Sequence, residues 1–409
     1  MKRRRTKSTG GNKREARRRR QRMQASRSTT PSRDAALDQQ TTPGPPTLGE
    51  STLTKRPLPP SSQVGREGPR PPLLGSCKSV EHYEKLNRIE EGTYGVVYRA
   101  RDLETGEVVA LKRLKLDKET QGFPVTSLRE IHTLMTARHP HIVRLREMVT
   151  SAPSASGSMP SVYLVMDFVE HDLRGLLEAM PTPFLPSEVK TLMQQLLSAA
   201  ALMHSRWILH RDLKPSNLLM NNTGHIVVAD FGLARTYGEP QDASSALTTP
   251  VVTLWYRPPE VLLGSKTYGP PVDMWSIGCI FAELLSNEPL FPGKGEMDQL
   301  SRIFQVKGLP TDEGWPGWRE LPHAQGVTFR PPSGQTRSLR TIFPHLTHHG
   351  LDLLTQLLAY DPDQRISAQE ALKHPYFSEA PLPKHPSLFP SWPSKASQEG
   401  RQRADQYAS

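Results

Sequence analysis

The sequence predicts an α+β fold in which a β-rich segment precedes a mainly helical one. Residues 83–101 alternate polar and apolar side chains, as strands with one buried face do. Two further short apolar runs, 108–112 and 162–166, are expected to be strands. From Leu173 onward the pattern is mainly helical, most clearly over 189–204, where apolar residues recur every three or four positions. The 409 residues are enough for a substantial core.

The part of the chain before Cys77 is rich in Arg, Ser, Thr, Pro and Gly and poor in apolar residues, which predicts a disordered arm. The formal net charge of +11 belongs to this arm, because its first 30 residues contain most of the excess Lys and Arg. Two basic clusters, 2–5 and 17–20, favour a nuclear-import signal, with the cytoplasm as a second location. Weak contact of residues 2–22 with RNA or DNA and a merely solvated charge run are the alternatives.

Other bulk features exclude several classes of protein. The two cysteines, Cys77 and Cys279, cannot build a disulfide framework, which favours a reducing compartment. No run of 18 or more apolar residues is present, so we expect no membrane span and no membrane partner. Prolines within 43–72 indicate a semi-extended linker or a docking segment. Residues 379–409 are again rich in Pro and Ser and are expected to form a flexible tail.

The residues most informative about chemistry form a predicted β-hairpin. Two short apolar runs, 218–220 and 226–228, are joined by turn-forming residues. Antiparallel pairing about the centre of this turn places Asn217 opposite Asp230, with a slip of one residue possible. Two oxygen ligands side by side on a rigid ribbon can hold Mg²⁺, which takes its remaining ligands from waters and phosphates.

Asp212 lies five residues before Asn217, on the loop that enters the hairpin. A carboxylate there can orient a hydroxyl nucleophile and accept its proton, and Lys214 can supply positive charge to a transferring phosphoryl group. Each of these residues alone is more simply explained as a turn or surface residue. Their combination at this spacing, beside the hairpin, predicts phosphoryl transfer.

At these residues the sequence resembles the protein kinases, whose catalytic loop reads H-R-D-L-K-P-x-N and whose metal loop reads D-F-G. Lys214 is typical of the serine/threonine branch. The resemblance implies a bilobal protein kinase fold, with a small β-rich N-lobe that carries one key helix and a larger, mainly helical C-lobe. The expected domains are a disordered arm (1–78), a kinase domain (79–378, with the N-lobe at about 80–167, the hinge at 167–171 and the C-lobe at 172–378) and a tail (379–409).

The turn at 91–95 contains two glycines and continues as strand, which argues against a dinucleotide-binding turn and allows the turn to lie over phosphates. Glu90 stands where most kinases have the first glycine of this loop, and we expect it to face solvent. Lys112 is the one basic residue of an apolar strand. It is either a snorkelling edge residue or, as the resemblance implies, the partner of Glu130 that directs its ammonium group toward the phosphates of ATP.

The resemblance also implies the rest of the ATP site. Met166 is the expected gatekeeper, Asp167 and Val169 offer backbone hydrogen bonds to adenine, and Asp172 holds the ribose. The base is expected to be sandwiched by four apolar residues, Ile89, Val97, Ala110 and Leu219, although periodicity alone places them in the core. The expected ATP-binding residues are Ile89, Glu90, Glu91, Gly92, Thr93, Tyr94, Gly95, Val96, Val97, Ala110, Lys112, Asp167, Val169, Asp172 and Leu219.

Residues 124–130, with the sequence PVTSLRE, resemble the cyclin-contacting helix of the cyclin-dependent kinases and are nearest to the variant called PITSLRE. The resemblance implies that a cyclin-like regulatory subunit binds through this helix. It also implies that protein substrates with serine or threonine followed by proline bind at residues 251–260. A structural ion pair between Glu260 and Arg365 is expected below that platform.

Regulation by phosphorylation is a further expectation. A phosphate carried by the activation segment can be neutralised by three arginines, Arg129, Arg211 and Arg235. The family's spacing places that phosphate on Thr248, with the neighbouring Thr249 as the alternative. The resemblance also implies inhibitory phosphates on Thr93 and Tyr94, at the loop that covers ATP.

The leading hypothesis is therefore an ATP- and Mg²⁺-dependent serine/threonine protein kinase, cyclin-activated, acting in cell-cycle control or in transcription and RNA processing. One alternative is a catalytically weak kinase-fold scaffold, in which Glu90 and the unusual Pro258 signal decay. A second is a nucleic-acid-associated protein that acts through its basic arm. Retention of all the catalytic residues argues against the scaffold. Those residues are Asp212, Lys214, Lys112, Glu130, Asn217 and Asp230.

Overall fold

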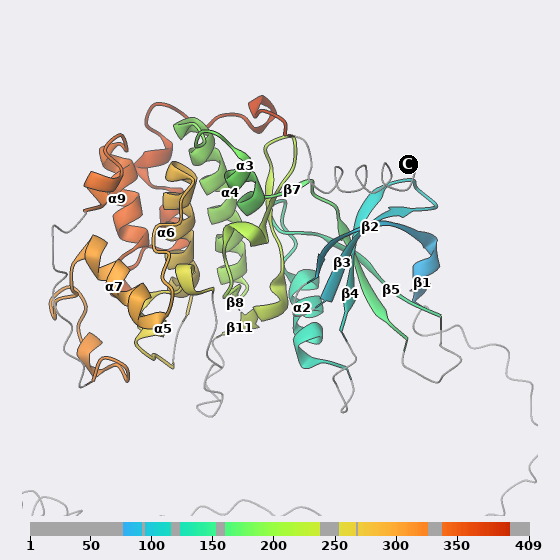
Figure 1. The fold of residues 1–409 in the computed structure, drawn as a ribbon, viewed down its shortest axis with the longest axis horizontal. Coiled ribbons are helices and arrows are strands. Elements are labelled where there is room, and N and C mark those ends of the chain that lie inside the picture. The colour runs from blue at the N-terminus through green and yellow to red at the C-terminus, as the bar shows by residue number, and fades with distance from the viewer. Residues whose placement is uncertain are drawn as a thin grey trace, which may run out of the picture. The chain divides into compact units, whose positions relative to one another are not determined.

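The computed structural model describes residues 77–91, 95–115, 123–152, 160–237, 253–266, 269–325 and 338–392. They form a sheet-rich N-lobe with one long helix and a mainly helical C-lobe (Figure 1). The expected α+β architecture, with its β-rich part first in the sequence, is confirmed. The basic arm lies outside the described residues, so its disorder stays a prediction.

The N-lobe is built on one six-stranded sheet with the strand order β1-β5-β6-β4-β3-β2. All neighbouring strands in it are antiparallel except β1 and β5, which are parallel. Helix α2 packs against the sheet through Ile131, which shares a small core with Leu114 and Leu164. The N-lobe elements are β1 (Lys78–Ser79), β2 (Tyr83–Glu91), β3 (Gly95–Asp102), β4 (Val108–Leu114), α2 (Val125–Thr136), β5 (Leu145–Thr150) and β6 (Val162–Asp167).

The C-lobe surrounds two long helices, α4 and α6, whose packed faces form the larger core (Figure 1). Helix α6 is apolar and buried through almost its whole length, as expected for a helix with neighbours on all sides. The C-lobe helices are α3 (Leu173–Ala179), α4 (Pro186–Ser205), α5 (Pro259–Leu262), α6 (Pro271–Ser286), α7 (Glu296–Lys307), α8 (Leu339–Ile342), α9 (His348–Leu357) and α10 (Ala368–Leu372). Its short strands are β7 (His171–Asp172), β8 (Ile208–Leu209), β9 (Leu218–Met220), β10 (Ile226–Val228) and β11 (Arg235–Thr236).

The prediction of a flexible tail from residue 379 is wrong for residues 379–392. This segment lies along α4, where the backbone amide of Lys384 donates to the carbonyl oxygen of Ser187 at 2.9 Å. The hydroxyl of Thr191 donates to the carbonyl oxygen of Lys384 at 2.6 Å. Phe389 is buried against the larger core. Proline-rich composition suggested disorder, but a few apolar side chains and partners for the backbone are enough to fix an extended segment.

No helix in the described part of the chain has the length and apolar character needed to cross a membrane.

Candidate active site

The predicted hairpin forms, but its register is shifted by one residue from a pairing centred between Thr223 and Gly224. Leu218 pairs with Val228 and Leu219 with Val227, so the hairpin is centred on Thr223. The cause is a three-residue loop closed by the amide of Asn221, which donates to the carbonyl oxygen of His225 at 3.0 Å.

As a result Asn217 lies opposite Ala229, whose amide donates to the carbonyl oxygen of Asn217 at 2.8 Å. Asp230 is the next residue and has a left-handed backbone conformation, with φ of 57°. The chain therefore turns sharply at Asp230 as it leaves the strand. The slip of one residue that the sequence left open is the observed arrangement.

Asp212, the predicted catalytic base, is buried and held by hydrogen bonds on both carboxylate oxygens. Lys214 Nζ lies 2.7 Å from Asp212 Oδ2. Asn217 Nδ2 donates to the carbonyl oxygen of Asp212 at 2.7 Å and to Asp212 Oδ2 at 3.1 Å. Thr253 donates its amide (3.1 Å) and its hydroxyl (3.0 Å) to Asp212 Oδ1. The carboxylate is therefore fixed in orientation before any substrate binds.

The backbone of the catalytic loop is anchored by Asp273, which lies in the first turn of α6. Its carboxylate accepts the backbone amides of His210 at 3.0 Å and Arg211 at 2.9 Å. His204 Nε2 lies 3.0 Å from the same carboxylate. Burial favours the neutral form of Asp273, but His204, His210 and the Arg211 amide outweigh it and hold its pKa below the usual range. A buried charge thus ties the loop to the core of the C-lobe.

Lys112 and Glu130 form the predicted ion pair, with Lys112 Nζ 2.6 Å from Glu130 Oε1. Lys112 Nζ also lies 3.0 Å from Asp230 Oδ1, which joins the N-lobe pair to the end of the hairpin. Burial opposes the charged form of Lys112, but attraction to Glu130 and Asp230 is larger and raises its pKa to about 12. Burial likewise opposes the charge of Asp230, but Lys112 and His210 hold its pKa below the usual range. The snorkelling alternative for Lys112 is excluded, since its ammonium is buried.

The residues expected to hold Mg²⁺ have a suitable donor set. Because the amide nitrogen of Asn217 is used by Asp212, its oxygen is left for other partners. The side chain of Asp230 is 40% exposed, so its carboxylate is accessible. Among the described residues no group of three or more His, Cys, Asp and Glu is placed to form a metal cage. One carboxylate and one amide oxygen fit Mg²⁺, which keeps several waters and binds phosphates, better than ions that need three or four protein ligands.

The apolar residues expected to sandwich adenine are not core residues. Ile89 is 39% exposed, and Val97, Ala110 and Leu219 are only partly buried. Ile89 sits at a β-bulge between β2 and β3, which displaces it from the regular pairing. Strand-period reasoning alone assigned these positions to the core, and their exposure departs from that assignment; their contact with adenine stays a prediction.

The loop expected to cover the phosphates is described only at its two ends. Glu90 and Glu91 are exposed at the end of β2, as expected for Glu90. Gly95 begins β3, where a Cβ atom would lie 2.4 Å from the carbonyl oxygen of Arg113, so only glycine allows β3 and β4 to approach this closely. Val96 follows it in β3. Gly92, Thr93 and Tyr94 lie outside the described residues.

The hinge residue Asp167 ends β6, directly after the buried Met166, and Val169 lies between β6 and β7. Asp172 is exposed and caps α3, because its carboxylate accepts the amide of Gly175 at 2.6 Å. Asp172 is also paired with Leu219 across β7 and β9. The structure therefore places Asp172, expected to hold the ribose, beside Leu219, one of the residues expected to contact adenine, on the small sheet β10-β9-β7.

The three arginines expected to bind an activating phosphate are neighbours. They come from α2 (Arg129), the catalytic loop (Arg211) and β11 (Arg235). Burial and then the positive charges of Arg235 and Arg211 lower the pKa of Arg129, as expected for cations held close together. Thr248 and Thr249, the expected phosphate carriers, lie outside the described residues.

The substrate platform begins within the described residues at Thr253. Glu260 and Arg365 form the expected pair through two bonds of 2.8 and 3.0 Å, and both side chains are buried. This fork-to-fork geometry fixes the platform to the helical core. Pro258 is buried and precedes α5 as its N-cap residue, so this unusual proline fits the fold.

Two site residues were not predicted from the sequence. Thr253 was expected only as part of the substrate platform 251–260, yet it makes two hydrogen bonds to Asp212. No role was predicted for Asp273, yet it anchors the catalytic loop. For Asp273 a signal did exist, because an acidic residue ahead of the apolar run 274–285 requires a buried partner.

A β-rich lobe with a Lys–Glu pair, set against a helical lobe that supplies an aspartate on a loop and a hairpin flanked by Asn and Asp, defines the protein kinase class. Comparison with known proteins agrees, since the protein kinase domain family matches residues 83–377. The chain belongs to this family and, within it, to the PITSLRE type of cyclin-dependent serine/threonine kinases.

Three relatives show how far this similarity extends. Cyclin-dependent kinase 11B of Homo sapiens is 54% identical over 329 residues, which cover 80% of this chain and 40% of that protein. Serine/threonine-protein kinase ppk23 of Schizosaccharomyces pombe is 55% identical over 333 residues, covering 81% of each chain. Serine/threonine-protein kinase PITSLRE of Drosophila melanogaster is 53% identical over 336 residues, covering 80% of this chain and 34% of that protein. The chain thus matches less than half the length of the human and fly relatives.

Proposed function

We propose that this protein transfers the γ-phosphoryl group of ATP to serine or threonine side chains of proteins while bound to a cyclin-like subunit. The proposal depends on one observation: Asp212 of the C-lobe and Lys112 of the N-lobe are each held in place by hydrogen bonds and ion pairs. Asp212 is oriented by Lys214, Asn217 and Thr253. Lys112 is held between Glu130 and Asp230.

In this reaction Asp212 orients the substrate hydroxyl and accepts its proton, a role that typically contributes about 10²–10⁴-fold to a rate. Lys214, beside the same carboxylate, places positive charge where the phosphoryl group is transferred. Lys112 directs its ammonium toward the α- and β-phosphates. Asn217 and Asp230 are the residues to hold Mg²⁺, which neutralises the charge of the phosphates when it is bound.

The substrate class we propose is serine or threonine followed by proline. The platform that starts at Thr253 supports this, because a proline lacks the amide hydrogen that an ordinary residue would leave unpaired there. Thr253 itself connects the platform to the base through its bonds to Asp212.

The partner surface we propose is the outer face of α2. Val125, Leu128 and Met135 are 58, 52 and 57% exposed, and their spacing places them along one side of the helix. The other side buries Ile131 and Leu134. An exposed apolar row on a helix that carries a catalytic glutamate is a suitable contact for a regulatory subunit. The names of the relatives, cyclin-dependent kinases, support a cyclin-like subunit.

We also propose activation by a phosphate on Thr248, or on Thr249, bound by the three arginines, and inhibition through Thr93 and Tyr94. We further propose that the basic arm directs the protein to the nucleus and that residues 2–22 make weak contact with nucleic acid. The proposed role of the protein is in cell-cycle control or in transcription and RNA processing. Replacing the basic residues of 2–5 and 17–20 by glutamine in the full chain separates these parts. Phosphoryl transfer should survive, whereas nuclear accumulation or RNA retention should fall.

The proposal is tested with the full chain purified with the cyclin that it captures from nuclear extract. Transfer of labelled phosphate from ATP is measured to a peptide with Ser-Pro and to a matched peptide with Ser-Ala. We expect transfer to the first peptide only, with dependence on Mg²⁺ and on the partner. Absence of transfer from a complex that binds ATP would overturn the kinase proposal in favour of the scaffold. Equal transfer to both peptides would contradict the proline preference alone.

A further inference from the structure

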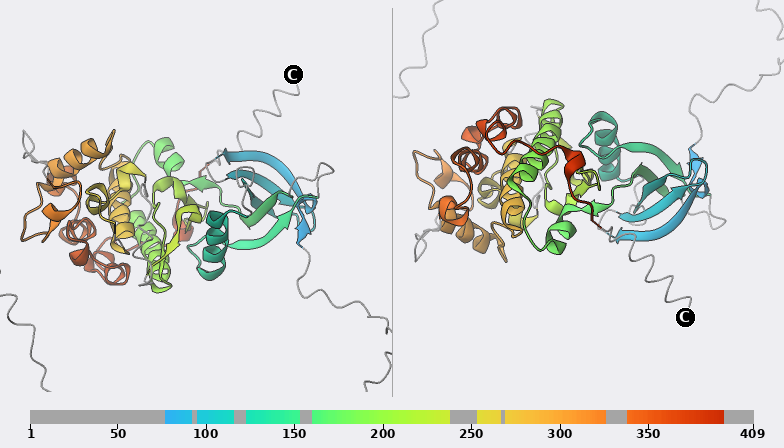
Figure 2. Two further views of the ribbon diagram at one scale, coloured as in Figure 1. Left: turned by 90° about the horizontal axis from the view of Figure 1, so that it is seen from below. Right: turned by 90° about the horizontal axis from the view of Figure 1, so that it is seen from above.

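The segment 379–392, which we call the C-terminal strap, crosses the surface of α4 and ends beside the catalytic hairpin (Figure 2). Its first half is fixed to α4 by backbone and side-chain bonds. Lys190 Nζ donates to the carbonyl oxygen of Glu379 at 2.9 Å. Lys384 makes a 2.8 Å ion pair with Glu188, in addition to its bonds with Ser187 and Thr191. The strap is therefore anchored before it reaches the hairpin.

The second half of the strap is packed on the loop of the hairpin. A Cβ atom on Gly224 would lie 2.6 Å from the carbonyl oxygen of Pro386 and 2.7 Å from the ring of Phe389, so the loop and the strap are in closest contact there. The amide of Trp392 donates to Asn222 Oδ1 at 3.2 Å. Two of the three residues of the loop thus touch the strap.

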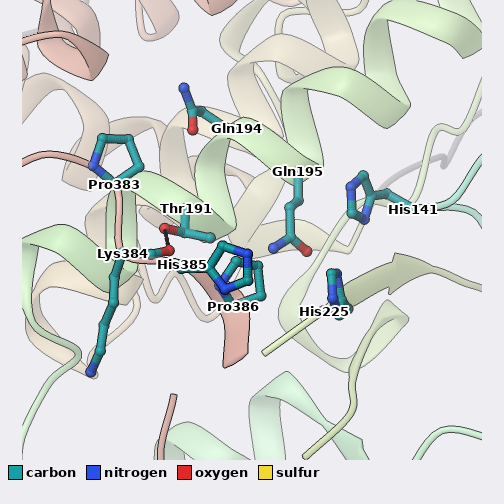
Figure 3. A pocket seen from close by; sticks show the side chains of 9 residues that line it. All are labelled: His141, Thr191, Gln194, Gln195, His225, Pro383, Lys384, His385 and Pro386. Carbon is teal, nitrogen blue, oxygen red and sulfur yellow. Dashed lines mark hydrogen bonds between the residues drawn. The ribbon is translucent and has the colours of Figure 1, made fainter. Parts of the chain in front are cut away.

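The opposite side of the same loop is held by α4. Gln195 Nε2 donates to the carbonyl oxygen of Gly224 at 3.1 Å, and Gln195 Oε1 accepts the amide of Ile226 at 2.7 Å. Figure 3 shows Gln195 and Thr191 of α4 facing Pro386 of the strap across a cavity of about 320 Å³, with His225 of the hairpin at its edge. The loop is thus held between a helix and the strap.

The far end of the strap reaches the third strand of the same sheet. The Trp392 ring meets His171 of β7 edge-on, with ring centroids 6.5 Å apart. It meets Phe184 in the same way at 6.0 Å. His171 Nε2 in turn lies 3.0 Å from Asn222 Oδ1, the acceptor used by Trp392. The strap therefore contacts both β7 and the β9–β10 loop.

This small sheet carries or adjoins four of the residues expected to bind the nucleotide and the metal. Asn217 precedes β9, Asp230 is the second residue after β10, and Asp172 and Leu219 lie on β7 and β9. Its strands are only two or three residues long, too short to be stable by their own pairing. The position of its ends consequently depends on what packs against it.

We propose that the C-terminal strap is a positioning element for the ATP and metal site, which fixes the β7-β9-β10 sheet from outside and so sets the placement of Asn217, Asp230 and Asp172. This inference rests on the proposed function for the identity of the ligands. It assigns a catalytic effect to residues that never touch substrate. A displacement of about 1 Å at such residues can cost about 100-fold in rate.

The test compares two double variants of the full chain. Phe389→Ala/Trp392→Ala removes the side chains that meet the loop and β7. Leu382→Ala/Leu388→Ala removes two strap side chains that are 65 and 64% exposed, and it serves as the matched control. The measurements are the dissociation constant for ATP with Mg²⁺, the Mg²⁺ concentration at half-saturation, and amide hydrogen exchange over 218–228.

For Phe389→Ala/Trp392→Ala we expect about tenfold weaker ATP binding, a matching rise in the Mg²⁺ requirement, and faster exchange confined to 218–228. The control variant should match the parent. A Trp392→Phe variant, which keeps an aromatic ring at this position, should lose much less ATP affinity than the double variant. The KM of the double variant for the peptide should equal that of the parent. An unchanged ATP affinity in the folded variant would overturn the proposal, as would exchange that rises equally across the C-lobe. If the double variant does not fold, Asn222→Ala gives the same reading, because it removes the acceptor shared by Trp392 and His171.

These outcomes are distinct from failure of the proposed function. ATP affinity and hydrogen exchange are measured on the chain alone, without a cyclin or a peptide. A parent chain that binds ATP but transfers no phosphate would contradict the kinase proposal and leave the role of the strap standing. If the parent transfers phosphate but the strap variants bind ATP as the parent does, the role of the strap is contradicted and the kinase proposal stands.

Discussion

The two halves of the site are held in different ways. In the C-lobe half, Asp212 and its loop are buried and fixed by hydrogen bonds from Lys214, Asn217 and Thr253 and by the carboxylate of Asp273. In the N-lobe half, α2 presents an exposed apolar face, and Glu130 is linked to Asp230 of the other half through Lys112. The comparison teaches that the orientation of the base Asp212 is fixed by its hydrogen bonds. The ion pair of Lys112 and Glu130, which we call the phosphate clamp, depends instead on the position of helix α2. The partner that we propose to bind on α2 would act on the adjustable half.

The largest effect is expected in the fixed half, from Asp212→Asn. The variant keeps the shape of the side chain but loses the carboxylate that accepts the proton. We expect kcat to fall by about 10³-fold, within the usual range for loss of a general base, while ATP affinity stays near that of the parent. Single-turnover transfer and nucleotide binding measure the two quantities. Transfer as fast as in the parent would remove Asp212 from the role of base.

In the adjustable half, Glu130→Gln breaks the clamp without removing Lys112. The ammonium then keeps Asp230 as its partner and shifts toward it, away from the phosphates. We expect kcat/KM for ATP to fall by about 100-fold, since a small misplacement near the reacting groups has an effect of that size. Excess partner should not restore activity. Full rescue by partner would show that α2 is positioned without the ion pair.

A smaller effect is expected on the outer face of α2. Leu128→Glu places a charge in the proposed interface, and we expect the affinity for the cyclin-like subunit to fall by about 30-fold, the scale of an interface hot spot. Unfolding free energy should change by less than about 0.5 kcal/mol, because the side chain is exposed in the free chain. Leu103→Glu, at an exposed position between β3 and β4, is the control and should bind as the parent does. Equal loss in both variants would place the partner elsewhere.

The smallest effect concerns pH. The pKa of Asp273 is lowered, so its stabilisation is complete above its ordinary value of 3.8 and is lost as the pH falls below it. The pKa of Lys112 is raised to about 12, so its stabilisation is complete below 10.5 and is lost as the pH rises through 12. Stability curves from denaturant unfolding should therefore show an acid limb that Asp273→Asn flattens and an alkaline limb that this variant leaves intact. A change in the alkaline limb would contradict the separation of the two halves.

The sequence motifs predicted the chemistry of the site more completely than they predicted how the site is packed. The pair Lys112–Glu130 was implied by the resemblance to the protein kinases, and the grouping of Asp212, Lys214 and Asn217 was predictable from their spacing on the loop that enters the hairpin. The register of the hairpin was not settled, since the same turn residues allow loops centred on Thr223 or beside it. The anchoring role of Asp273 depends on contacts 62 and 63 residues away, which spacing does not reveal. The strap was predicted to be flexible because its overall composition is rich in Pro and Ser. Composition does not show that two single residues, Phe389 and Trp392, pack against the C-lobe and hold the segment in place.

The most direct test of the account is the position of the metal itself. A crystal of the full chain with Mn²⁺ and a non-hydrolysable ATP analogue gives that position from the anomalous signal of manganese. The account predicts an ion about 2.1 Å from the side-chain oxygen of Asn217 and from the carboxylate of Asp230, bridging to the phosphates. An ion bound away from these two side chains, or phosphates that do not meet Lys112, would contradict it.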